Sequence, residues 1–400
     1  METKKKGFPT AFWVCACTEI FERLAYYLGR SLILIFVTAS VATGGLGLSD
    51  TVAANMQSNL TAFSYLLPLF GAVIVDKYIG ARYTTPVGMF IAAAGYFTGG
   101  IAKSSAGVYA MIFLVSLGLA LFKNGAIIGR VITDKSQMDP AFSMRYTLVN
   151  VGAFIGTFLV GILYKDVFAK DGVLGFAPCF KMAALMMVLG GLWYIFVCWR
   201  FLGDLGKLPF KKTLTEEEKA AEAKKKEETG TKQPLTTIEK KRIGAIFVAS
   251  LFSIVFWIFW YLGYMPVYFY WAENMDWVVA GYQVPSTWFD AANSLFCVIL
   301  GPVTAALWKK LAARPQGDMS LFRKTGLGIA IIGVGYLFYA AIDIMRGGEK
   351  ASVLWLIVFA FLLTMGEMFF SPLGHSFISK YSPSRYLAVM MSVWGFATFI

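Results

Sequence analysis

Residues 12–41 form a stretch that otherwise reads as lipid-soluble, yet four charged residues stand inside it. These charges and two tyrosines recur every three or four residues, a spacing that places them on one face of a helix. The face consists of Glu19, Glu22, Arg23, Tyr26, Tyr27 and Arg30, and apolar Phe21, Leu24, Leu28 and Leu32 turn away from its centre. Carboxylates beside arginines inside a membrane helix are typical of proton relays.

The energetic cost of these charges indicates where they lie. One charge at the bilayer centre costs roughly 2.5 to 3.5 kcal/mol, so four cost about 10 kcal/mol before compensation. We therefore expect the face to line a polar cavity; the alternative is a static buried ion pair that holds two helices together. Two carboxylates flanking one guanidinium leave a spare negative charge that invites protonation, which favours a proton relay at Glu19, Glu22 and Arg23.

Other polar side chains stand in later apolar stretches. Lys123 in "LALFKNGAII" lies deep in an apolar run, where the alternative is an anchor whose amine reaches the membrane surface. Placing the Glu367 charge in the apolar run "TMGEMFFSPLGHS" costs too much free energy for the residue to be without function. Ser371 follows one turn later on the same face. Asn150 and Asn293 carry amides that can bond a peptide backbone, or form a hydrogen bond between two helices.

Composition identifies the elements that must position these residues. Of 400 residues, 58% are hydrophobic and 15% charged, which indicates an integral membrane protein. The apolar runs are continuous, so they predict helices and an all-α membrane protein rather than a barrel. Eleven stretches of roughly spanning length begin near Thr10, Met56, Thr84, Gly107, Arg145, Pro178, Ile243, Pro285, Lys324, Ala351 and Arg385.

Basic residues set the topology. With "TKKK" at the N-terminus inside, the basic loops all fall on the cytoplasmic side, as the positive-inside rule requires. The net charge of +12 is therefore a topology signal and does not point to nucleic-acid binding. The first span follows directly on the N-terminus without a small-residue cleavage site, so we expect no cleavable signal peptide. The predicted location is the cell membrane, with many passes through the lipid bilayer.

One long polar stretch divides the chain. Residues 205–242 carry both charge signs and predict a cytoplasmic linker between an N-terminal six-helix bundle, residues 1–204, and a C-terminal bundle, residues 243–400. Within the linker, Glu216 to Glu228 are expected to form a solvated helix. The final stretch from Arg385 is too short to cross with its flanks, so we expect the C-terminal bundle to be incomplete and a twelfth span to be missing.

Metal chemistry has almost no ligands here. All five cysteines lie in or beside apolar segments, where buried thiols pack as small hydrophobic groups. The pair in "CAC" has the wrong spacing for zinc, and His375 is the only histidine. We expect no metal and no cofactor, and we read His375 as a polar residue of a cavity or helix end rather than the main proton carrier.

Several motifs, in order along the chain, resemble the proton-dependent oligopeptide transporter family (POT/PTR2) of the major facilitator superfamily. "EIFERLAYY" is similar to its ExxERFxYY signature on the first helix. "GAVIVDKYIGARYT" (71–84) resembles the loop motif after the second helix, "FSMRYTLVNVGAFIG" (142–156) the fifth helix, "TWFDAANSLFCVILGPV" (287–303) the eighth and "GEMFFSPLGHSFISKYSP" (366–383) the tenth. The resemblance implies the major facilitator fold, with two six-helix bundles, and proton-coupled import of di- and tripeptides by a monomer.

The resemblance also implies roles for single residues. Lys123 would exchange partners with a carboxylate of the first helix and bind the substrate's carboxylate, while Glu367 would bind the peptide's amino terminus. Substrate contacts would come further from Tyr26, Tyr27, Arg30, Tyr65, Asn150, Asn293 and Ser371. The loop motif that joins helix ends during the conformational cycle would comprise Gly71, Asp76, Lys77, Gly80 and Arg82.

Two features depart from the family pattern. The seventh helix reads "FWIFWYLGY", which places Tyr261 where the family has a glutamate, so Arg30 lacks its expected partner at the external gate. Either Arg30 pairs elsewhere or the gate and the proton coupling are altered. In addition, the polar linker cannot form the two extra spans that bacterial members often insert.

Three alternative functions remain open at this stage. A carrier of nitrate or another small anion or metabolite would keep the fold and change the cargo, and Tyr261 strengthens that alternative. A multispan membrane enzyme would need a nucleophile and a base near an interface, and none is in view. A receptor or an uncoupled channel would ignore the proton gradient.

Overall fold

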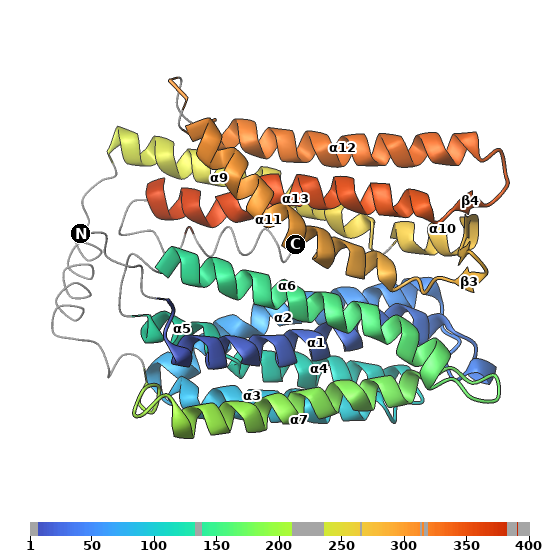
Figure 1. The fold of residues 1–400 in the computed structure, drawn as a ribbon, viewed down its shortest axis with the longest axis horizontal. Coiled ribbons are helices and arrows are strands. Elements are labelled where there is room, and N and C mark those ends of the chain that lie inside the picture. Colours follow the sequence, from blue (N-terminus) through green and yellow to red (C-terminus); the bar gives the residue numbers. More distant parts are fainter. Residues whose placement is uncertain are drawn as a thin grey trace. The chain divides into compact units, whose positions relative to one another are not determined.

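The computed structural model describes residues 7–132, 138–209, 236–264, 266–312, 314–315, 319–381 and 390. The chain separates into two compact units, Met1–Thr213 and Leu214–Ile400. Helices dominate both units, and the only strands in the described residues are two-residue segments in unit 2 (Figure 1). The predicted all-α architecture is confirmed.

Unit 1 is built from long helices that run alongside one another (Figure 1). Its helices are α1 (Thr10–Thr38), α2 (Asp50–Lys77), α3 (Ala81–Gly99), α4 (Ser105–Leu121), α5 (Asn124–Val131), α6 (Met138–Ile162) and α7 (Phe176–Arg200), with a π-helical turn η3 (Leu163–Val167) after α6. After α1, a short 3₁₀ turn η1 (Val41–Thr43) ends at Gly44, whose positive φ of 86° a glycine adopts without strain.

Helix α1 lies among other helices of unit 1. It contacts α2, α5, α6 and α7, so its apolar side chains are buried as well as its polar face. Leu28 and Leu32 are 1% and 0% exposed although they point away from the centre of the charged face. Because α1 is enclosed by protein, its charges can be compensated by neighbouring helices instead of by water.

The fourth apolar stretch is not one continuous helix. Helix α4 ends at Leu121, Phe122 is extended, and α5 begins at Asn124 with Lys123 at its N-cap position. The sequence was read as a single span through Lys123, and that reading is corrected. The break places Lys123 and Asn124 at a helix end rather than on a regular helix face.

Unit 2 contains α9 (Thr237–Leu262), α10 (Pro266–Asn274), α11 (Trp288–Ala312), α12 (Leu321–Met345) and α13 (Leu354–Tyr381). Between them, β1 (Met275–Asp276) pairs in parallel with β4 (Ala351–Ser352), and β2 (Val278–Val279) pairs antiparallel with β3 (Tyr282–Gln283). A capping box at Thr236 and Glu239 starts α9, so this helix begins before the predicted Ile243. Residues 210–235, which include the predicted linker helix, lie outside the described residues.

Six helices in the described part of the chain are long and apolar enough to cross a membrane: α2, α6, α7, α9, α11 and α12. Two shorter apolar helices are Ser105–Leu121 and Leu354–Phe370. Each predicted stretch from Thr10 to Ala351 corresponds to one of the helices above, with α5 continuing the fourth stretch and α10 preceding the eighth. The stretch from Arg385 lies outside the described residues, so the count of twelve spans is only partly visible.

Helices α2 and α4 approach closely at Gly71. A Cβ placed on this glycine would lie 1.9 Å from the carbonyl oxygen of Ala120, a backbone atom that no side-chain rotation can move. Small residues at such crossings allow membrane helices to pack backbone against backbone. Gly71 therefore has a packing role that any larger residue would disturb.

We expect Gly71→Val to destabilise the protein by about 1–3 kcal/mol or more, because the added carbons force α2 and α4 apart. The measurement is the thermal unfolding midpoint of the purified protein in detergent. Gly244→Val is the matched control, since a Cβ at Gly244 in α9 meets nothing within 4 Å. Equal midpoints for the two variants would contradict the packing role of Gly71.

Candidate functional site

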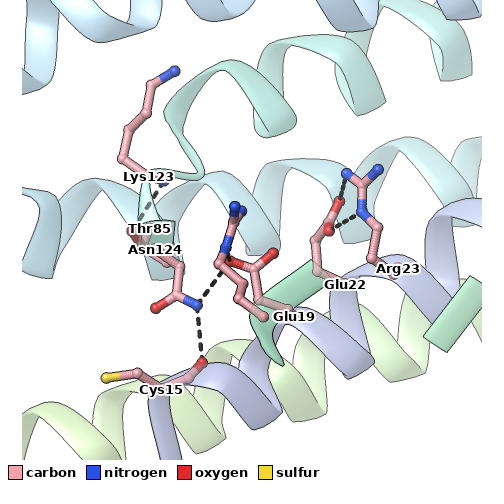
Figure 2. Close-up of polar contacts among 8 residues, drawn as sticks. Cys15, Glu19, Glu22, Arg23, Thr85, Lys123 and Asn124 are labelled. Carbon is pink, nitrogen blue, oxygen red and sulfur yellow. Dashed lines mark hydrogen bonds and ion pairs between the residues drawn. The ribbon is translucent and has the colours of Figure 1, made fainter. Parts of the chain in front are cut away.

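The charged face of α1 is buried inside unit 1. Glu19 and Glu22 are 1% and 0% exposed. Arg23 donates to Glu22 with two nitrogens, Nε to Oε2 at 2.5 Å and Nη2 to Oε1 at 2.6 Å (Figure 2). This two-pronged pair balances the Glu22 charge within α1 itself, without a cation from another helix.

Glu19 is balanced by a residue from another helix. Arg145 in α6 donates from Nε to Glu19 Oε1 at 2.9 Å. Asn124, the first residue of α5, donates to the same oxygen at 3.1 Å and to the Cys15 carbonyl oxygen at 2.9 Å (Figure 2). The Glu19 carboxylate therefore joins three helices of unit 1.

Arg145 and Asn124 were not among the predicted site residues. Arg145 stands in the apolar stretch "FSMRYTLVN", so the cost argument that singled out Glu367 would also have singled out this arginine. Asn124 was harder to predict, because its bonds to Glu19 and to the Cys15 carbonyl depend on the helix break before it. No helical spacing links either residue to Glu19.

The charge balance of the cluster differs from the one expected. The prediction counted two carboxylates and one guanidinium and inferred a spare negative charge. With Arg145 included, each of the two carboxylates is paired with an arginine, so these four groups carry no net charge when all are ionised. That premise for a proton relay is wrong, because Arg145 compensates the charge assumed to be spare.

Lys123 lies beside this cluster at the break between α4 and α5. Its Nζ donates to the Pro68 carbonyl oxygen of α2 at 2.9 Å, and its backbone N–H donates to Thr85 Oγ1 at 3.3 Å. Figure 2 shows its side chain extending away from those of Asn124 and Glu19. Lys123 thus reaches α2, the neighbour of α1, and its amine is held by a backbone carbonyl.

Aromatic side chains continue the face of α1 beyond the carboxylates. The Arg23 guanidinium lies 4.9 Å from the ring centre of Tyr26, and that of Arg30 lies 5.9 Å from Tyr27. Tyr26 and Arg30 are both 6% exposed, whereas Tyr65 in α2 is 51% exposed. Stacking of cations on rings accounts for the alternating arginines and tyrosines of the signature.

Tyr261, the residue that departs from the family pattern, lies in α9 of unit 2. Its ring packs 5.9 Å from Trp257 and 5.1 Å from Trp260, measured between ring centres. The position expected to carry an acid therefore belongs to an aromatic cluster.

Asn150 and Asn293 differ in their contacts. Asn150 donates to the Tyr146 carbonyl oxygen at 3.0 Å, a bond within α6. Asn293 in α11 donates to two residues of α13, Thr364 Oγ1 at 2.9 Å and Glu367 Oε2 at 3.0 Å. The alternative of an interhelical hydrogen bond thus applies to Asn293, where the bonded partner is itself a predicted site residue.

Glu367 is 8% exposed and is held by neutral groups. Besides Asn293, the Cys297 thiol contacts this carboxylate, with Sγ 4.0 Å from Glu367 Oε2. Thr364, which stands one turn before Glu367 and also bonds Asn293, was not among the predicted site residues. Among the described residues, no arginine or lysine forms an ion pair with this carboxylate. The side chains of Ser371 and His375 lie outside those described.

The loop motif after α2 connects helix ends inside unit 1. Arg82 donates from Nη1 to the Gly203 carbonyl and from Nη2 to the Cys198 carbonyl at 2.7 Å, which binds the start of α3 to the end of α7. A Cβ on Gly80 would lie 2.1 Å from the Gly206 carbonyl oxygen. Lys77 ends α2, and the side chain of Asp76 lies outside those described.

The cysteines form no metal site in the described part of the chain, where no group of three His, Cys, Asp or Glu residues could hold a metal ion. All five cysteines are free, and Cys15, Cys179, Cys198 and Cys297 are buried. They pack as small hydrophobic side chains.

Comparison with known proteins bears on the family. A protein-family model described as the POT family matches residues 204–400. The match covers just under half of the chain and indicates the POT family. A di-/tripeptide transporter of Lactococcus lactis subsp. cremoris is 24% identical over 98% of this chain and 87% of its own length. The peptide transporter YePEPT of Yersinia enterocolitica is 24% identical over 94% of this chain and 83% of its own length.

A solved structure supports the fold of this chain. The crystal structure of a peptide transporter POT in complex with sulfate matches with a TM-score of 0.86 and 24% identity, covering 99% of this chain and 88% of that one. The predicted major facilitator fold is confirmed, and the chain is a membrane-embedded protein of a transporter family. These relatives are transporters, not enzymes, and the named family requires no cofactor in general.

We expect Arg145→Gln to destabilise the fold by about 2–5 kcal/mol, because it leaves the buried Glu19 carboxylate without its cation. In the double variant Glu19→Gln/Arg145→Gln, no buried charge is left uncompensated. More than half of the stability lost in Arg145→Gln should therefore be recovered. Thermal unfolding midpoints in detergent compare the two. A double variant no more stable than the single one would show that the ion pair is not the reason for the loss.

Proposed function

We propose that this chain is a symporter that imports di- and tripeptides together with protons by alternating access. The observation that carries the proposal is the pair of buried carboxylates of α1, each bound to an arginine. It occurs in a chain that is similar over 94–98% of its length to peptide transporters. Structures of similar POT proteins contain peptide-like or small zwitterionic ligands, such as alafosfalin and 5-aminolevulinic acid.

Protons would couple to transport through the pairs on α1. When Glu22 takes up a proton, it loses the charge that holds Arg23, and the same applies to Glu19 and Arg145. Each protonation frees a guanidinium to bind an anionic group, so the proton and the cargo stabilise the same state. A ligand shifts a conformational equilibrium only through such a difference in affinity.

The cargo's two charged ends would bind to groups of opposite charge. Lys123 in unit 1 binds the carboxylate, and Glu367 in unit 2 binds the amino group. The partners of Glu367 among the described residues are neutral, which supports this role, because a buried carboxylate without a cation gains most from one. Tyr26, Tyr27, Arg30, Tyr65, Asn150, Asn293 and Ser371 would complete the contacts.

The remaining parts of the proposal concern the whole chain. Residues 1–204 and 243–400 form the two bundles, and residues 205–242 link them in the cytoplasm. The N-terminus lies in the cytoplasm, the location is the cell membrane and the carrier acts as a monomer. Gly71, Asp76, Lys77, Gly80 and Arg82 join helix ends as the bundles alternate.

We expect Glu22→Gln to abolish gradient-driven uptake of labelled dialanine into proteoliposomes, while counterflow exchange survives. The variant keeps the shape and one hydrogen-bonding oxygen but cannot carry a proton. Glu273→Gln, at an exposed glutamate of α10, is the control and should behave as wild type. Failure of folded wild-type protein to take up any di- or tripeptide would refute the peptide assignment.

We expect wild type to prefer dialanine over N-acetyl-dialanine by about 10- to 100-fold in counterflow competition, and Glu367→Gln to lose most of this preference. The acetyl group removes the cation that Glu367 is proposed to bind. If transport depends on Lys123 but not on Glu367, the cargo is a small anion, which is the alternative that Tyr261 favours.

A further inference from the structure

Arg145 uses only part of its hydrogen-bonding capacity. A guanidinium carries five N–H donors, one on Nε and four on the two terminal nitrogens. Glu19 is bound through Nε alone, at 2.9 Å. Among the residues that the structure describes, Nη1 and Nη2 of Arg145 have no hydrogen-bond partner. The side chain is 30% exposed, although it belongs to a helix that could span a membrane.

The unused edge of Arg145 has a definite shape. Nη1 and Nη2 form the end-on fork of the guanidinium, which matches the two oxygens of a carboxylate. The plane of the group lies against Gly125, where a Cβ would be 3.1 Å from Cζ and 3.2 Å from Nη2. The missing side chain at position 125 thus leaves the room that the guanidinium occupies, and Glu19 fixes its Nε end.

The electrostatic balance favours an anion at this edge. Each carboxylate of α1 already has its own arginine, and Glu19 occupies only the Nε side of Arg145. Charged donors without partners are costly in a membrane protein unless water or an anionic group satisfies them. A carboxylate would satisfy both the charge and the fork.

We propose that the Nη1/Nη2 edge of Arg145 binds the carboxylate of the cargo, with Glu19 positioning the guanidinium from behind. The proposal rests on the proposed function for the identity of the cargo, and it makes Arg145 a specificity-determining residue for a free carboxyl terminus. Lys123 contributes a point charge to the same group, whereas Arg145 supplies the paired geometry.

The test compares dialanine with alanyl-alaninamide, which lacks the carboxylate, as competitors in counterflow exchange. Wild type should prefer the carboxylate by about 10- to 100-fold. Arg145→Lys keeps the charge beside Glu19 but removes the fork, so the preference should fall by at least about tenfold. Arg200→Lys, at the end of α7, is the matched control and should keep the wild-type preference.

A second variant covers a failure of Arg145→Lys to fold. Glu19→Gln/Arg145→Gln leaves no uncompensated buried charge and should also lose the preference, measured as competition for bound ligand rather than proton-driven uptake. The proposal would be overturned if either folded variant kept the wild-type preference for dialanine over alanyl-alaninamide and only Lys123→Gln lost it. The cargo carboxylate would then be assigned to the lysine alone.

The two proposals fail in different ways. If wild type binds no peptide, protection against thermal unfolding by sodium sulfate and sodium succinate is compared between wild type and Arg145→Lys. Protection that depends on Arg145 would keep the anion site and refute only the peptide cargo. Equal protection of both proteins, or none of either, would refute the anion site as well.

Discussion

The need to neutralise two carboxylates inside a membrane bundle governs the arrangement of unit 1. An uncompensated charge in such surroundings costs several kcal/mol, so each carboxylate needs a cation within hydrogen-bond distance. Glu22 finds one in its sequence neighbour, whereas Glu19 requires Arg145 from α6 and an amide from the start of α5. The contacts of α1 with α5 and α6, and the helix break before Asn124, serve this compensation.

The two units hold their buried carboxylates in opposite ways. In unit 1 each of the two carboxylates is paired with an arginine. In unit 2 the described partners of Glu367 are an amide and a thiol, neither of which can neutralise it. Among its described partners Glu367 therefore has no cation, so a ligand cation would supply what the neutral donors cannot.

The sequence predicted what depends on composition and on spacing within one helix. Apolar runs located the helices, and the cost of membrane charges identified Glu19, Glu22, Lys123 and Glu367. Contacts between distant segments were not predictable: Arg145 and Glu19 are separated by 126 positions, and no local pattern relates them. The break at Lys123 was missed for a similar reason. Its sequence is apolar on both sides, and the helix ends because tertiary contacts hold Lys123 and Asn124 there.

Pairing Glu19 with an arginine has a consequence for coupling. A lysine released by protonation is a single mobile charge on a flexible stem, whereas Arg145 has a planar group already placed against Gly125. Little conformational freedom is then lost when its terminal nitrogens bind an anion. Protonation of Glu19 would remove the charge that competes for Arg145 and so strengthen the hold of Arg145 on the anion. Proton and cargo would thus cooperate through the same guanidinium.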